Sequence, residues 1–156
     1  MLVKDIMNKD VIWVGLYTTL RELLTKFDSF HTFPIVPVVD EEMKLIGIVR
    51  LQNLIDVFLP YDRELLKLSP FIDEFWDENI FKVEIEPELG ILVVMSDIMD
   101  RDFVVIKSEE KIERAYEQLK AHKKDQMPVV NEEGKLCGII GLFDIVRYVF
   151  KEKGLY

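Results

Sequence analysis

Cysteine and histidine are scarce in this sequence, with one cysteine, Cys137, and two histidines among 156 residues. A single cysteine cannot form an intramolecular disulfide, so nothing points to an oxidising compartment and we expect a cytoplasmic protein. Too few of these side chains exist for a Cys/His metal cluster, and no Ser/His/Asp or Cys/His constellation has recognisable local context. We therefore predict that the protein is not an enzyme and requires no catalytic cofactor.

Long apolar runs and positive charge are also missing. The apolar runs are far shorter than the roughly 20 residues that cross a bilayer, so we expect no membrane span. The formal net charge is −9, which disfavours nucleic acid and anionic lipid, because both are bound by clustered positive charge. Hydrophobic residues make up 49% of the chain and charged residues 31%. This balance predicts a soluble globular protein of one compact domain or two small ones.

The chain contains an internal repeat. The tripeptide Asp-Ile-Met occurs at 5–7 and again at 97–99, and Pro-Val-Val occurs at 37–39 and again at 128–130. The two offsets are 92 and 91 residues, so a single deletion aligns the halves. Leu-Ile-Gly-Ile-Val at 45–49 then falls on Leu-Cys-Gly-Ile-Ile at 136–140.

Each copy shows the same succession of hydrophobic periods: a strand, a helix, a β-hairpin and a final helix. In chain order we predict strands over 11–14 and 103–106, helices capped by Thr18 or Thr19 and by Ser108, hairpins over 35–49 and 128–140, and helices over 51–59 and 142–151. Gly134 suits positive φ in the second hairpin turn. A three-stranded sheet is marginal alone, so we predict a mixed α+β fold in which two β-α-β-β-α units pack about a pseudo-twofold.

An acidic insertion separates the copies, giving a first repeat over 1–59, an insertion over 60–93 and a second repeat over 94–156. Residues 71–90 hold seven acidic side chains against one lysine. Apolar residues at helical spacing predict a short amphipathic helix here: Phe71, Ile72, Phe75, Trp76, Ile80 and Phe81. These side chains either cap the core or form a partner-binding surface.

This ordered set of motifs, present twice, resembles a tandem CBS-domain pair, or Bateman module, over about residues 3–58 and 95–150. The resemblance implies that the two repeats pack through their sheets and leave clefts for an adenosine-containing ligand such as AMP, ADP, ATP or S-adenosylmethionine. It also implies a homodimer shaped as a flat disc and, for a regulatory module, a regulated protein partner.

The ligand motif of that family resembles Gly-apolar-apolar-Thr/Ser-x-x-Asp. Its carboxylate would accept hydrogen bonds from two ribose hydroxyls, and the helix N-terminus would favour a phosphate. In the second repeat Asp144 stands at the carboxylate position and Gly141 at the hydroxyl position. In the first repeat Arg50 replaces the hydroxyl and Asn53 the carboxylate. If one cleft holds a ligand, we expect it to be that of Asp144.

Other residues complete the predicted site. Arg101 is a cation for a phosphate, and Val104, Met127 and Ile139 are apolar walls for an adenine. Each also has a structural interpretation, because core packing uses such walls and an acid such as Asp144 complements a helix dipole without a ligand. The run 122–124, His-Lys-Lys, is interpreted as a solvated helix end.

Two hypotheses therefore stand. The leading one is a non-catalytic regulatory module that binds an adenosine-containing ligand in a cleft between the repeats. The alternative is a structural or protein-interaction module with degenerate, empty clefts. There Arg50, Asn53 and Gly141 record lost binding, and the insertion docks a partner.

Overall fold

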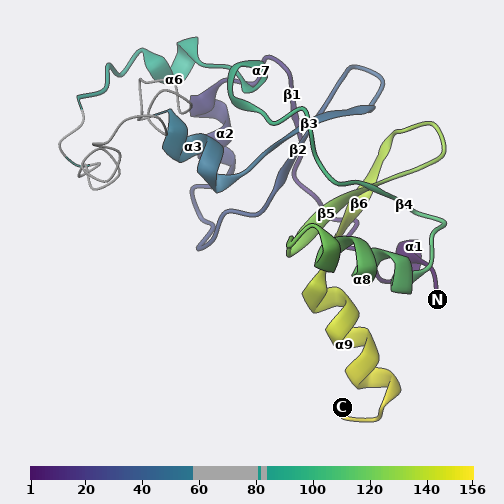
Figure 1. The fold of residues 1–156 in the computed structure, drawn as a ribbon. Helices are drawn as coiled ribbons and strands as arrows, with labels where there is room; N and C mark the ends of the chain where they lie inside the picture. The colour runs from purple at the N-terminus through teal and green to yellow at the C-terminus, as the bar shows by residue number, and fades with distance from the viewer. Residues whose placement is uncertain (58–80, 82–83) are drawn as a thin grey trace, which may run out of the picture.

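The computed structural model describes residues 1–57, 81 and 84–156, and the amphipathic helix predicted around Phe75 lies outside this part of the chain. Two three-stranded sheets lie side by side, each with helices packed on it (Figure 1). The predicted mixed α+β fold with two repeats is confirmed.

The two sheets have the same topology. The first contains β1 (Val14–Gly15), β2 (Val36–Val39) and β3 (Leu45–Val49), and the second contains β4 (Ile106–Lys107), β5 (Gln126–Val130) and β6 (Leu136–Gly141). In each, a parallel pair is followed by an antiparallel hairpin. Val14 pairs with Val38 and Ile106 with Val129, so the register repeats with the offsets found in the sequence.

The first strand of each repeat is shorter than predicted and begins later. We expected strands over 11–14 and 103–106, but only the last of these residues in each repeat joins the sheet. Upstream of both predicted strands, the backbone bonds to the other repeat. The backbone N–H of Asn8 donates to the Ile139 oxygen at 2.8 Å, and that of Asp100 donates to Ile48 at 2.8 Å.

A side-chain cap sets the start of one helix, whereas a sheet contact delays the start of another. Helix α2 (Leu20–Lys26) follows Thr19, whose hydroxyl accepts from the Glu22 N–H at 3.1 Å, so the cap predicted at Thr18 or Thr19 is Thr19. The prediction for Ser108 was wrong. Helix α8 (Ile112–Ala121) begins after Lys111, because Ser108 is buried and its N–H donates to the Val130 oxygen, which extends the sheet.

The head of each repeat packs in the core of the other one (Figure 1). Val3, in α1 (Val3–Ile6), is fully buried against Leu119 and Ile140 of the second repeat. Met95, in α7 (Met95–Ile98), is fully buried against Leu23 and its neighbours in the first repeat. Lys4 also crosses over, and its hydrogen bond to Glu109 raises the pKa of the Lys4 ammonium. Each core therefore needs both halves of the sequence.

The two hairpin turns meet across the pseudo-twofold. The Leu45 N–H donates to the Gly134 oxygen at 3.1 Å, and the Leu136 N–H donates to the Met43 oxygen at 3.0 Å. Met43 and Gly134 hold the same place in their turns, with φ of 66° and 80°. The positive φ expected at Gly134 is thus confirmed.

Three further helices complete the described part of the chain, and one of them, the last, contacts α1, α8 and the end of β6. They are α3 (Leu51–Asp56), α6 (Leu89–Leu92) and α9 (Leu142–Glu152). Helix α6 packs on α2. In the part of the chain that the structure describes, no helix is both long and apolar enough to cross a membrane.

Candidate functional site

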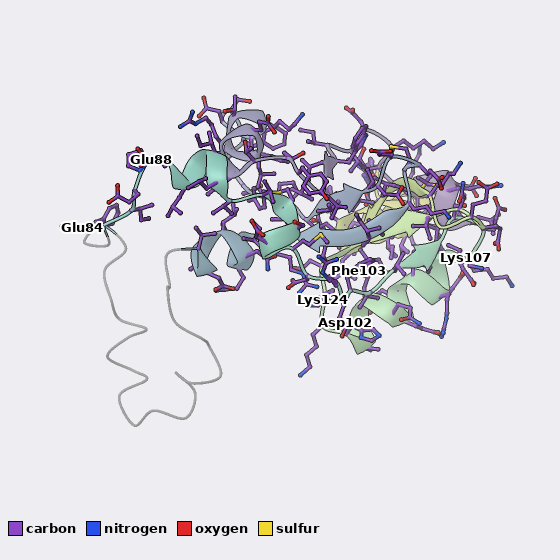
Figure 2. The ribbon with its side chains drawn as sticks, turned by 90° about the horizontal axis from the view of Figure 1, so that it is seen from above. Glu84, Glu88, Asp102, Phe103, Lys107 and Lys124 are labelled. Atoms are coloured by element: carbon purple, nitrogen blue, oxygen red, sulfur yellow. The ribbon has the colours of Figure 1, made fainter. Side chains whose placement is uncertain are left out.

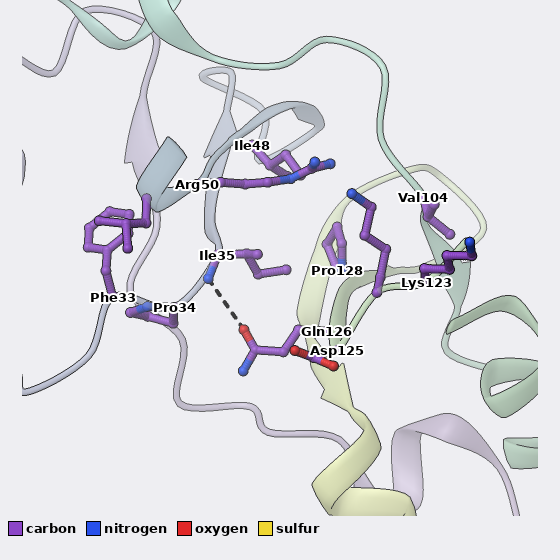
Figure 3. Close-up of a pocket in the computed structure, with 12 residues that line it drawn as sticks. Phe33, Pro34, Ile35, Ile48, Arg50, Val104, Lys123, Asp125, Gln126 and Pro128 are labelled. Carbon is purple, nitrogen blue, oxygen red and sulfur yellow. Dashed lines mark hydrogen bonds between the residues drawn. The ribbon is translucent and has the colours of Figure 1, made fainter. Parts of the chain in front are cut away.

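A cleft of about 250 Å³ lies between the two repeats, and both contribute to it (Figure 3). Its apolar lining residues come from both sheets and the loops before them: Phe33, Pro34, Ile35, Ile48, Leu51, Val104 and Pro128. The Ile35 N–H donates to the Gln126 side-chain oxygen at 3.3 Å, which joins the repeats at one side of the cleft. We call this the cationic cleft, because three cationic side chains, Arg50, Lys123 and Lys124, line it against a single acid, Asp125.

These cations come from opposite sides of the cleft. Arg50 extends from the end of β3 toward the second repeat, where Lys123 and Pro128 form the facing wall (Figure 3). A hollow of about 500 Å³ adjoins the cleft and shares Arg50, Val104 and Lys124 with it. Asp102 and Phe103 line this extension, and Figure 2 shows them close to Lys124 on one side of the molecule.

A short network holds Arg50 in place. The Asn53 oxygen accepts from the Arg50 backbone N–H at 2.7 Å, which caps α3, and the Asn53 amide donates to the Asp100 carboxylate at 3.2 Å. The Arg50 Nε lies 3.7 Å from the other Asp100 oxygen. Asn53 is only 8% exposed and lies behind the lining of the cleft. Arg50 therefore borders the cleft without filling it.

A second cleft, of about 240 Å³, occupies the corresponding place in the other repeat. Its lining residues include Asn8, Asp10, Ile12, Thr32, Ile139 and Gln126, with Phe27 and Phe30 as an aromatic wall. Among the described residues that line it there is no lysine or arginine. We call it the Asp10 cleft, because the carboxylate of Asp10 is the one formal charge among these lining residues.

Asp144 lies near this second cleft but is engaged by its own helix. One carboxylate oxygen accepts from the Gly141 N–H at 2.8 Å, and the other lies 3.1 Å from the Arg147 guanidinium. As the described residues form them, neither cleft is lined by Asp144. Gly141 lies against the chain before β5, where an added Cβ would come within 3.2 Å of the Asp125 oxygen. A hydroxyl side chain at this position would require the chain at Asp125 to shift by a few tenths of an ångström.

The structure separates the other predicted site residues. Val104 lines the cationic cleft and its extension, and Ile139 lines the second cleft. Met127 is 1% exposed and belongs to the core of the second repeat. Arg101 is exposed beside the extension but does not line it.

The sequence pattern indicates a solvated helix end at Lys123 and Lys124, yet both line the cationic cleft. Lys123 has φ of 54°, which ends α8 and turns the chain toward β5. Their position in the repeat could have identified these lysines as cleft residues. They precede the second β-hairpin, just as Phe33 and Pro34 precede the first, and both segments line the cleft. Within the described residues, no three His, Cys, Asp or Glu side chains form a group that could hold a metal ion.

The sequence model of the CBS domain matches this chain twice, at residues 3–60 and 95–151. One relative is the inosine-5′-monophosphate dehydrogenase of Methanocaldococcus jannaschii, 26% identical over 92% of this chain but only 22% of the enzyme. Another is an uncharacterized protein of the same organism, 25% identical over 94% of this chain and 90% of that one. The chain thus spans about a fifth of the first relative and nearly all of the second.

Solved structures show the same fold. CBSX2, crystallised in complex with AMP, is 25% identical, has a TM-score of 0.68 and covers 97% of this chain and 98% of its own. The CBS domain pair of protein MJ0100, in complex with 5′-methylthioadenosine and S-adenosyl-L-methionine, has a TM-score of 0.64 at 20% identity. It covers 96% of this chain and 99% of its own.

Proposed function

This chain belongs to the CBS domain family, and on that premise we propose that it is a non-catalytic regulatory module that binds an adenine nucleotide in the cationic cleft. One observation carries the proposal: three cations, Arg50, Lys123 and Lys124, line a cleft with apolar walls to which both repeats contribute, and they outnumber its one acid, Asp125. Ligand sites in proteins typically combine apolar walls with a few polar groups that fix orientation.

The chemistry of this cleft fits a nucleotide in two parts. Ile35, Ile48 and Pro128 offer apolar surface for a purine ring, and the three cations offer charge-assisted hydrogen bonds to phosphate oxygens. The complex of CBSX2 with AMP supports the same ligand class. AMP, ADP and ATP suit this cleft better than S-adenosylmethionine, because the sulfonium of the latter is itself a cation.

The Asp10 cleft suits an adenosine compound without a phosphate. Asp10 is its one formally charged lining residue, and Asp144 lies beyond its wall at the start of α9. We propose that S-adenosylmethionine or a neutral adenosine derivative would be favoured there, against the walls of Phe27 and Ile139. Such a ligand, bound in this second cleft, would leave the cationic cleft free for a nucleotide.

Sensing would follow from the position of the cationic cleft between the repeats. A nucleotide held by Arg50 on one side and Lys123 on the other would favour one spacing of the two repeats. The size of any response is limited by the difference in ligand affinity between the two arrangements.

A homodimer is the third part of the proposal. An apolar groove between α8 and α9 is lined by Tyr116, Ile145, Val146 and Val149, among others, and Tyr116 and Phe150 remain nearly half exposed. Burying such a surface against a second copy would remove apolar area from water. A regulated partner protein would then meet the module as a dimer. We also propose a cytoplasmic setting, because Cys137 is the one cysteine of the chain and cannot form an intramolecular disulfide.

Calorimetric titration with AMP tests the nucleotide site. We expect saturable binding to the native chain and roughly ten- to hundredfold weaker binding to Lys124→Met, since a hydrogen bond to a charged group contributes roughly 1.5–3 kcal/mol. Lys111→Met is the matched control, because the Lys111 side chain makes no capping hydrogen bond to α8 and lines neither cleft. Equal affinity of all three proteins for AMP would show that the nucleotide binds outside this cleft. No binding of any adenosine compound would favour an interaction module with empty clefts.

A further inference from the structure

A third cavity, of about 780 Å³, lies outside both adenosine clefts, at the turn end of the first sheet. It is bordered by the segment around β1 and by the β2–β3 turn. Its lining combines two aromatic side chains, Trp13 and Tyr17, with three acids: Asp40, Glu41 and Glu42. We call it the aromatic–acidic cavity.

The two aromatic side chains are unusually open to solvent. Trp13 is 46% exposed and Tyr17 is 78% exposed, although both border a hollow that could bury them. Among the described residues, neither side chain makes a hydrogen bond or ring contact that would explain its place, whereas Phe27, Phe30 and Phe33 pack on one another. Both side chains therefore line the cavity and are not part of the core of the first repeat.

The second repeat contains the same turn, and the register identifies each counterpart. Gly15 pairs with Val39, and Lys107 pairs with Val130, so Gly15 corresponds to Lys107. The turns also match bond for bond, because the Asp40 N–H donates to Lys44 and the Asn131 N–H donates to Lys135. Glu41 and Glu132 are the first residues after those donors and correspond to each other.

The two repeats differ at this pair in one respect. In the second repeat the Lys107 ammonium lies 3.0 Å from the Glu132 carboxylate, at an end of the molecule away from Lys124 (Figure 2). In the first repeat Gly15 offers no side chain. Within the described residues Glu41 then has no ion pair.

The next acid along the turn shows no such difference. Glu42 pairs with Lys44 at 3.7 Å, and its counterpart Glu133 pairs with Lys135 at 3.3 Å. At this turn the first repeat therefore lacks only the cation that corresponds to Lys107, at the position of Gly15.

The aromatic residues appear at the same place as the lost cation. By the repeat offset, Trp13 corresponds to Val105 and Tyr17 to Glu109, so the second repeat has no aromatic side chain at either position. Aromatic faces attract ammonium groups, and a carboxylate beside them adds direct charge attraction. The first repeat therefore keeps the acid of the Lys107–Glu132 pair, removes its cation and adds two aromatic walls.

We propose that the aromatic–acidic cavity binds an alkylammonium group supplied from outside the chain, in the place that the Lys107 ammonium occupies in the second repeat. The group belongs either to a free amine or to a lysine side chain of another protein. The site is separate from the adenosine clefts and does not depend on the proposed nucleotide function.

The probe for this site is the fluorescence of Trp13, measured in a Trp76→Phe background so that one tryptophan reports. Titration at constant ionic strength would use butylamine, Nα-acetyl-lysine methylamide and, as the uncharged match, butanol. We expect a saturable change with both amines and none with butanol. Glu41→Gln should weaken the amines about two- to fivefold, as expected for an exposed charge pair.

The decisive variant is Gly15→Lys, which supplies the missing ammonium from within the chain and should abolish the response. Its matched control, Gly15→Ala, should leave the response unchanged. Both are compatible with the fold, because an added Cβ at Gly15 meets nothing nearer than the Thr18 hydroxyl at 3.9 Å. Tighter binding of the lysine derivative than of butylamine would support a protein lysine, and equal binding would support a free amine. An equal response to butanol, or an undiminished one in Gly15→Lys, would overturn the proposal.

Discussion

The side-chain amide of Asn53 donates a hydrogen bond to the Asp100 carboxylate across 3.2 Å, and this contact joins α3 to the segment that follows α7. By the repeat offset, the corresponding positions in the other half of the chain hold Asp144 and Asn8. The amide and the carboxylate have thus changed places between the repeats, and each pair keeps one negative charge. In the first repeat that charge also holds Arg50 beside the cationic cleft.

Asn53→Asp should destabilise the protein by about 1–3 kcal/mol, because it replaces the donor to Asp100 with a second carboxylate and leaves two partly buried acids in contact. Urea unfolding measures the loss. The double variant Asn53→Asp/Asp100→Asn copies the arrangement of residues in the second repeat and should recover most of the stability. A double variant no more stable than the single one would contradict this account of the pair.

The repeat and its fold followed from the sequence because both depend on local patterns. The hairpin turns were placed correctly, since Gly134 and the polar residues around it determine a turn by themselves. The crossing of α1 and α7 into the opposite cores was not predicted, because burial of Val3 against Leu119 is a long-range contact that no local period encodes.

The site was predicted less completely for a similar reason. The motif positions led to Arg50 and Asn53, but Lys123 and Lys124 enter the cleft only through the turn after α8. Asp144 was singled out by its motif position, and its bonds to Gly141 and Arg147 depend on side-chain geometry that spacing does not determine.

Val3→Ala should destabilise the protein by about 2 kcal/mol, although Val3 is the third residue of the chain. Its side chain is fully buried in the second core, and removing two buried methyl groups costs transfer free energy and leaves a cavity. Chemical denaturation compares it with Val105→Ala, the same substitution at a side chain that is 41% exposed. Equal stability of the two variants would show that the N-terminal segment is not part of that core.

Gly138→Ala should cost about 1–3 kcal/mol, because an added Cβ would lie 2.5 Å from the Asn8 backbone oxygen and the strand must shift. Gly47→Ala should cost less. There the nearest atom, also at 2.5 Å, is the sulfur of the flexible Met99 side chain. Melting temperatures of both variants, with Gly15→Ala as the unstrained control, would check this order, and the reverse order would contradict it.

Val149→Asp should convert the proposed homodimer to a monomer, because it places a charge in the apolar groove between α8 and α9. Analytical ultracentrifugation measures the mass at several protein concentrations. Phe143→Asp is the charge-matched control, since Phe143 is exposed on the same helix outside that groove. A native chain that sediments as a monomer, or two variants with equal mass, would refute the dimer surface.

The most direct test of the nucleotide-sensing proposal is thermal unfolding with AMP, ADP, ATP and S-adenosylmethionine, on the native chain, Lys124→Met and Asp144→Asn. The Asp144→Asn variant keeps a side-chain oxygen for the Gly141 N–H, so it removes the charge without removing the cap. A ligand at about a hundred times its dissociation constant adds roughly 2.7 kcal/mol, enough to raise the melting temperature by a few degrees. We predict that a nucleotide raises it in the native chain and in Asp144→Asn but much less in Lys124→Met. A nucleotide shift that survives in Lys124→Met and disappears in Asp144→Asn would contradict the cationic cleft as the site.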